Sequence, residues 1–158
     1  MQEVVLRTVA LLDAERVAAF QIACWQEAYR GLVPEAFLNA MDLQIRTEAW
    51  RRRIELRERE VVLAVTGIEL VGVARWTPAA LTELNTLYVS ERARGTGLAA
   101  RLLEAAIADG PATLWVFSGN ARALRFYEKH GFDLEGERRI DAGTGIEETR
   151  LTRLTPSR

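Results

Sequence analysis

Two glycines separated by one residue, Gly95 and Gly97, stand before a predicted helix in the stretch YVSERARGTGLAARLLEAA, residues 88–106. Free backbone N–H groups at the start of a helix form an anion site, which the helix dipole strengthens. Glycine lets the backbone approach a ligand closely, and Arg92 and Arg94 could add charge-assisted hydrogen bonds. The stretch therefore indicates either an anion-binding loop or a tight turn with two solvent-facing arginines.

The common nucleotide loops do not fit this stretch. Residues 95–100, GTGLAA, match the loose dinucleotide pattern, which needs an acidic residue about 20 positions further on to hold a ribose. Residues 113–120, TLWVFSGN, contain no carboxylate. A P-loop needs lysine after its last glycine, whereas Gly97 is followed by Leu98. The sequence therefore argues against both a dinucleotide-binding loop and a P-loop.

A second set of candidate residues lies in SGNARALRFYEKHGF, residues 118–132. Asn120 and Tyr127 are two helical turns apart, so they share one face about 10 Å apart along the axis. Ala123 lies between them and is small enough to leave room for a ligand. Asn120 is also a favoured N-cap type, and Tyr127 could be plain core, so a structural role remains open for each.

Together the two segments strongly resemble the GCN5-related N-acetyltransferase (GNAT) family. Its arginine/glutamine-x-x-G-x-G/A signature matches Arg92, Gly95 and Gly97, and its asparagine and tyrosine match Asn120 and Tyr127.

The resemblance is specific over about residues 82–133, where both motifs occur in the family's order and separation. It is looser elsewhere, although WQEAYRGLVPEAFLNAM, residues 25–41, looks like a first-helix segment of many bacterial members.

The resemblance implies acetyl-coenzyme A as co-substrate. Its pyrophosphate would lie on the amides of residues 94–99, and its pantetheine arm would bind the exposed backbone of Leu87 and Val89 as an added strand does. Strand 81–89 would splay from strand 112–118, and a bulge would leave one N–H free for the thioester oxyanion. The implied cofactor-binding residues are Leu87, Tyr88, Val89, Arg92, Arg94, Gly95, Thr96, Gly97, Leu98, Ala99, Ala100, Asn120, Ala123 and Tyr127.

The resemblance also implies catalytic roles. Tyr127 would protonate the leaving sulfur, and Asn120 would anchor the pantetheine. Many relatives carry an acid at the place of Glu83, which would act as base through water; it alternates with Leu84, so it shares a strand face with Asn85. A surface role for Glu83, a water chain without it, or no base at all remain alternatives.

The acceptor pocket is expected between helix 13–31, loop 31–41 and the last strand pair. Trp25, Tyr29 and Asn85 are the candidate acceptor-binding residues, and Phe37 could join them, although a core role is open for each aromatic ring. The acceptor would be a primary amine on a small molecule or a peptide. An acyl-CoA-binding module without turnover is the alternative function.

The elements that position these residues follow from hydrophobic periodicity and turn signals. The pattern predicts one domain, residues 1–158, with an α/β fold: a mixed, mostly antiparallel sheet with helices on both faces. Asp13 is the expected N-cap of the first helix. The expected strands are 3–9, 60–66, 70–76, 81–89, 112–118, 132–140 and 146–154, and the expected helices are 13–31, 33–41, 43–58, 95–111 and 119–131.

Composition excludes several kinds of site. A net charge of −1 gives no reason to expect nucleic acid or an anionic membrane as partner, and interleaved glutamates make Arg51, Arg52 and Arg53 a solvated face. Cys24 and His130 are single residues of their types, so a metal site and a His-based triad are not expected. No apolar run reaches the ~18 residues of a membrane span. A cytoplasmic monomer or homodimer is the default expectation.

Overall fold

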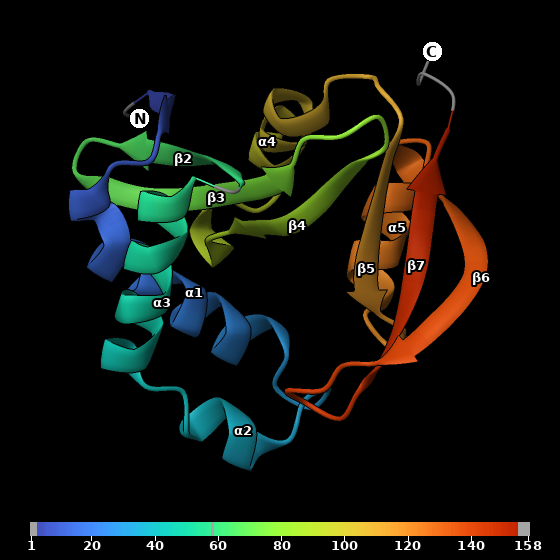
Figure 1. Ribbon diagram of the computed structural model, residues 1–158, viewed down its shortest axis with the longest axis horizontal. Helices are drawn as coiled ribbons and strands as arrows, with labels where there is room; N and C mark the ends of the chain where they lie inside the picture. Colours follow the sequence, from blue (N-terminus) through green and yellow to red (C-terminus); the bar gives the residue numbers. More distant parts are fainter. Residues whose placement is uncertain (1–2, 58, 155–158) are drawn as a thin grey trace.

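A seven-stranded sheet in the order β1-β2-β3-β4-β5-β7-β6 organises the molecule. The computed structural model describes residues 3–57 and 59–154. Figure 1 shows α1 and α3 on one side of the left half of the sheet and α4 on the other. The strands are β1 (Val4–Thr8), β2 (Glu60–Thr66), β3 (Glu69–Thr77), β4 (Thr82–Val89), β5 (Ala112–Phe117), β6 (Asp133–Ile140) and β7 (Glu147–Arg153), and the helices are α1 (Ala14–Ala28), α2 (Glu35–Asn39), α3 (Leu43–Leu56), α4 (Leu98–Ile107) and α5 (Ala121–Lys129), with 3-10 turns η1 (Leu11–Asp13) and η2 (Glu91–Ala93).

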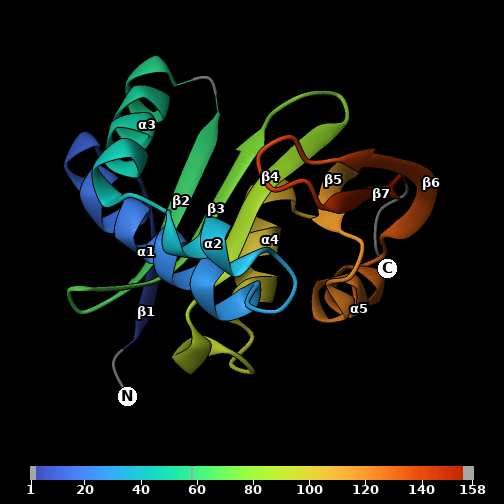
Figure 2. The ribbon, with the colours of Figure 1, turned by 90° about the horizontal axis from the view of Figure 1, so that it is seen from below.

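One strand pair departs from the antiparallel pattern of the sheet. β4 and β5 run parallel, and they pair only from Thr82 opposite Ala112 to Leu84 opposite Leu114. Beyond these residues the two strands diverge, as Figures 1 and 2 show. The predicted mixed sheet with a splayed central pair is therefore confirmed.

A β-bulge lies in β4 where the splay begins. Arg75 of β3 pairs with Thr86, and the next residue, Trp76, pairs with Leu84, so Asn85 has no partner across the ladder. An extra residue leaves backbone groups unpaired and bends the strand. The bulge that the family resemblance implies is present at Asn85.

Apolar residues at helical spacing hold the two helical layers against the sheet. Val17 of α1 and Trp50 of α3 are fully buried in one cluster with Val73 of β3. On the opposite face, Leu98 and Leu102 of α4 join a second cluster. A third cluster joins β5 to α5, so the sheet is covered on both faces as expected.

The predicted elements are all present, with shifts at their ends. The helix expected over 13–31 ends at Ala28, and the helix expected from residue 95 begins at Leu98 after a glycine turn. The helix expected over 43–58 ends at Leu56 because Arg57 adopts φ 51°; residue 58 lies outside the described residues. Within the described part of the chain, no helix is long and apolar enough to cross a membrane.

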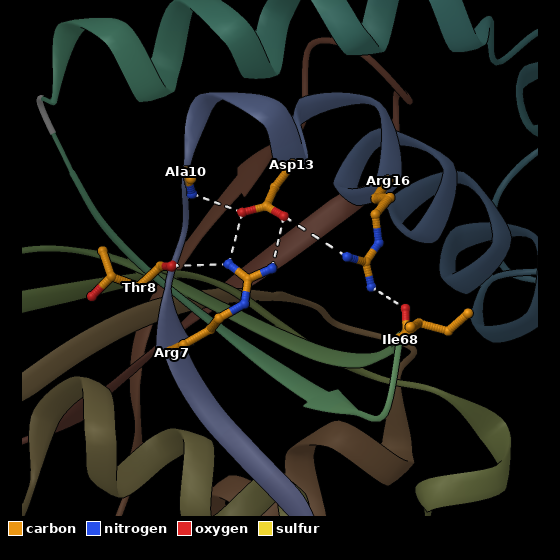
Figure 3. A network of polar contacts seen from close by, with 6 residues as sticks. All are labelled: Arg7, Thr8, Ala10, Asp13, Arg16 and Ile68. Atoms are coloured by element: carbon orange, nitrogen blue, oxygen red, sulfur yellow. Dashed lines mark hydrogen bonds and ion pairs between the residues drawn. The ribbon is translucent and has the colours of Figure 1, made fainter.

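Asp13 occupies the N-cap position of α1, as the sequence predicted, but its side chain makes no capping hydrogen bond to the helix. Its buried carboxylate instead accepts two hydrogen bonds of 2.8 Å from Arg7 and one of 2.7 Å from the Ala10 N–H (Figure 3). Arg16 lies 3.9 Å from the same carboxylate. The hydrogen bonds from Arg7 hold the pKa of Asp13 below its usual value. Asp13 therefore ties β1 to the start of α1, which fixes one edge of the helical layer.

Candidate functional site

The divergence of β4 and β5 opens a cleft of about 730 Å³. Its walls come from these two strands, from the first turn of α4, from α5 along its length and from the end of α1. Most of the residues selected from the sequence line it: Trp25, Tyr29, Asn85, Leu87, Tyr88, Val89, Arg94, Gly95, Gly97, Leu98, Ala99, Ala100, Asn120, Ala123 and Tyr127.

The glycine loop lies at one end of the cleft. Gly95 and Gly97 have φ of 77° and 86°, which L-residues with a side chain rarely adopt. A Cβ at either position would meet no atom within 4 Å, so the loop is open to a ligand. Gly97 is the N-cap of α4, and the first N–H groups of a helix have no partner within it. This end of the cleft can therefore bind an anion through backbone groups.

The two arginines before the loop point in different directions. Arg94 lines the cleft. Arg92 is 71% exposed at its side chain and forms an ion pair with Glu69 of β3, outside the lining. Thr96 is also outside the lining, with its Oγ1 donating to the Ala93 carbonyl at 2.5 Å. The geometry therefore favours Arg94 over Arg92 as the side chain that meets an anion.

Tyr127 of α5 also lines the cleft. Its ring is buried and packs against the rings of Phe126 and Phe132, with centroids 5.2 and 5.6 Å away. Its hydroxyl has no hydrogen bond to any described residue, so it remains available to a ligand. Burial raises the pKa of Tyr127 above its ordinary value of 10.0. The phenol therefore keeps its proton at neutral pH, as a proton donor must.

Asn120 is both an N-cap and a cleft residue. Its Oδ1 accepts a hydrogen bond of 3.2 Å from the Ala123 N–H and so caps α5. The same side chain lines the cleft. The cap occupies the carbonyl oxygen, so the amide NH₂ is the group left for a ligand.

The bulge residue Asn85 connects the cleft to Glu83. Its Oδ1 accepts from the Thr77 hydroxyl at 2.9 Å, and its Nδ2 donates to Glu83 Oε2 at 3.0 Å. Asn85 lines the cleft, whereas the half-buried Glu83 is outside the lining. A proton could reach Glu83 from the cleft through water rather than by direct contact.

Aromatic rings form another part of the cleft wall. Tyr29 packs edge-on against Trp25 and Phe117, with centroids 4.9 and 5.0 Å away. Trp25 also donates from Nε1 to the Tyr88 hydroxyl at 2.6 Å, which joins α1 to β4. Phe37 packs 6.0 Å from Trp25 and is outside the lining. Trp25 and Tyr29 are thus both packing residues and surfaces for a ligand.

Several lining residues were not selected from the sequence. Asp141 and Glu148 add carboxylates near the aromatic wall, and Glu148 accepts a hydrogen bond of 2.9 Å from Arg139. Glu148 lies opposite Phe117 in the sheet, and this pairing of distant segments has no local sequence signal. Cys24 is buried as expected, and burial raises the pKa of its thiol to about 12. The described residues contain no group of side chains that could hold a metal ion.

Comparison with known proteins identifies the family. Residues 24–149 match the family model described as an acetyltransferase (GNAT) domain. The chain is 24% identical over 141 residues to a probable N-acetyltransferase of Mycobacterium tuberculosis (Rv2775), covering 83% of this chain and 80% of that protein. It is 33% identical over 91 residues to YjcF, an uncharacterized N-acetyltransferase of Bacillus subtilis, covering 54% of this chain and 65% of that protein.

Solved structures agree in fold. The PaiA N-acetyltransferase of Thermoplasma acidophilum, in complex with coenzyme A, has a TM-score of 0.75 at 17% identity, with 96% of this chain and 99% of that one covered. YncA of Salmonella typhimurium, with acetyl-CoA, has a TM-score of 0.70 at 15% identity, with 99% and 96% covered. The matched domain spans most of the chain, so this protein belongs to the GNAT acetyltransferase family.

Proposed function

We propose that this protein is an acetyl-CoA-dependent N-acetyltransferase that acts on a primary amine. The observation that carries the proposal is the cleft itself, whose lining includes both an open helix N-terminus and the protonated hydroxyl of Tyr127, to which no described residue hydrogen-bonds. A long ligand with an anionic end and a thioester end fits this arrangement.

The donor would be held mainly by backbone. The diphosphate would accept hydrogen bonds from the amides of residues 94–99, with Arg94 adding charge. The pantetheine arm would lie along β4, at Leu87 and Val89, and the Asn120 amide would contact it. The open space at Gly95 and Gly97 supports close approach of the diphosphate, because a side chain there would project into it.

The reaction would be a direct transfer. The neutral amine nitrogen forms a bond to the acetyl carbonyl carbon, the carbon–sulfur bond breaks, and the thiolate takes a proton from Tyr127. The backbone N–H freed by the bulge at Asn85 would stabilise the oxyanion that develops on the carbonyl oxygen. The amine gives up its extra proton to water, and Glu83 is the carboxylate that would receive it through Asn85-bound water.

A two-stage measurement tests the function. Acetyl-CoA at millimolar concentration should raise the melting temperature, because a ligand that binds the folded state stabilises it. A panel of primary amines should then give free thiol with at least one acceptor. The absence of any stabilisation would refute the proposal, and tight coenzyme A binding without thiol release from a broad panel would favour the non-catalytic module.

A further inference from the structure

Arg75 of β3 is a buried cation without a hydrogen-bonding partner in the described part of the chain. The residue is 8% exposed, and its Nε and Nη1 atoms have no partner. Its guanidinium packs against the ring of Trp50 on α3, whose centroid lies 5.5 Å from the guanidinium carbon. Burial lowers the pKa of Arg75 to about 9, so it stays charged at neutral pH.

Such a group is costly to keep for packing alone. A buried charge is destabilising unless it is paired and hydrogen-bonded, and apolar residues often replace buried ions without loss of stability. Cation–π contact with Trp50 compensates the charge without satisfying the N–H donors. The charge of Glu83 raises the pKa of Arg75 but makes no hydrogen bond to it, so the unfilled donors at Arg75 point to a further, anionic partner.

A second arginine lies at the same ring. The guanidinium carbon of Arg53, on α3, is 5.1 Å from the Trp50 centroid, and its buried Nη1 also has no partner. Among the neighbouring charges that lower the pKa of Arg75, the positive charge of Arg53 has the largest effect. Two cations held at one ring repel each other, and a bound anion would relieve that repulsion.

Arg75 and Arg53 do not line the cleft, but Arg75 lies one strand away from its lining. Arg75 is directly opposite Thr86 in the sheet, and Thr86 lines the cleft with Asn85. The Trp50 indole donates to the buried Gln21 of α1 at 3.0 Å. Trp50 and α1 belong to one helical layer, and Trp25 of α1 lines the cleft. An acceptor that places its amine near Asn85 could thus extend toward Arg75.

We propose that Arg75 and Arg53 form an oxyanion subsite for the acceptor, so that the preferred substrate is an amine that also carries a carboxylate or a phosphate-type group. This inference rests on the proposed acetyltransferase function. An oxyanion would accept hydrogen bonds from the unfilled guanidinium donors, which are well suited to planar, bidentate recognition. The amine end would then lie in the cleft, where the acetyl group is transferred.

The test compares matched acceptors on wild-type protein and variants. The acceptors are ω-amino acids of increasing chain length, the corresponding amides, and the corresponding aminoalkylphosphonates. Arg75→Met removes the charge at similar length, Arg53→Gln removes the second cation, and Arg52→Gln, an exposed arginine on the same helix, is the control. Thiol release gives kcat/KM for each pair, and thermal melting reports the fold.

The wild-type protein should prefer an anionic acceptor over its neutral match by about tenfold or more in kcat/KM, since hydrogen bonds to a charged group are this strong. Arg75→Met should lose that preference, keep its rate on the neutral amine within about threefold, and melt no lower than wild type. Arg52→Gln should keep the preference. A larger preference for the phosphonates than for the carboxylates would still support the subsite and would identify its ligand as a phosphate-type group.

Two results would overturn the inference: equal use of anionic and neutral amines by the wild type, or a preference that survives Arg75→Met, whatever the melting temperature of that variant. If Arg75→Met does not fold, an unchanged preference in Arg53→Gln overturns it instead. Thiol release from neutral amines in any of these cases leaves the acetyltransferase proposal standing. Failure of the function itself would appear as no stabilisation by acetyl-CoA and no release with any acceptor.

Discussion

Tyr127→Phe separates catalysis from structure in this cleft. The Tyr127 hydroxyl makes no hydrogen bond to a described residue, so its removal should change the free energy of unfolding by less than about 0.5 kcal/mol. Its ring, which packs against Phe126 and Phe132, is kept. The substitution therefore removes only the proton donor that we propose for the leaving sulfur.

The expected loss of turnover follows from the leaving group. A positioned general acid contributes about 10²–10⁴-fold. A thiolate of cysteine type has a pKa of only about 8.5, so it leaves with less help than an alkoxide or an amide anion. We therefore expect kcat to fall by about ten- to a hundredfold, or about 1.4–2.7 kcal/mol of transition-state stabilisation.

The assay is thiol release at saturating acetyl-CoA and acceptor, with calorimetric titration of coenzyme A as a second readout. Affinity for coenzyme A should be nearly unchanged. Tyr29→Phe removes the same atom from the aromatic wall and is the matched control, which should retain most of the kcat. Equal turnover of wild type and Tyr127→Phe would remove the general-acid role. An equal loss of kcat in both variants would mean that removal of any hydroxyl from the cleft lowers turnover, so that the effect is not specific to Tyr127.

Three further predictions concern the loop and the fold. Gly97→Val should weaken coenzyme A binding by at least about tenfold by calorimetry, because the side chain projects into the open space of the cleft and strains a φ of 86°. Gly136→Val, outside the cleft lining, carries similar strain at φ 91° and should retain binding. A loss of binding in both variants would contradict the placement of coenzyme A at this loop. Arg153→Met should lower the free energy of unfolding by about 3 kcal/mol in urea, because the buried guanidinium donates to the carbonyls of Ala108, Gly110 and His130; a change below about 1 kcal/mol would contradict this. Asp13→Asn should lower the free energy of unfolding by about 2 kcal/mol at neutral pH. Because the folded-state pKa of Asp13 is lowered, the stabilisation by its charge is present above the unfolded pKa of about 3.9 and is lost as pH falls through the lower folded value. A loss of stability in the variant that persisted at acidic pH would show that the charge is not the cause.

The local elements could be predicted because each has its own signal. The change from helical to alternating periodicity after α3 predicted β2, β3 and β4 within a residue or two of their ends. Glycine at the end of the loop predicted the start of α4, although the sequence placed it two to three residues early, because Gly95 and Gly97 form the turn rather than the helix. Element ends depend on single turn conformations, such as that of Arg57, which periodicity does not report.

The site was harder to predict from the sequence because it depends on pairing between distant segments. Family resemblance supplied the two motifs, and the fold brings most of their residues to one cleft. Arg92 shows the limit of motif reasoning, since a signature position is occupied by a side chain that pairs with Glu69 on the neighbouring strand. Glu148 of β7 and Asp141, in the turn between β6 and β7, line the cleft because β7 lies beside β5 in the sheet, a pairing that no residue near them in the sequence predicts.

Arg75 has a signal in the sequence, because it is a charged residue in phase with the buried side chains of its strand. In the run LVGVARW, strand alternation places Arg75 in phase with Val73, which the structure buries completely. A charged residue in phase with a buried face predicts either an ion pair or a ligand, since a lone buried charge is unstable. The described residues offer no hydrogen-bonding partner to its Nε and Nη1 atoms. A buried charge in phase with an apolar strand face can therefore mark a ligand-binding residue, which is the role that we propose for Arg75.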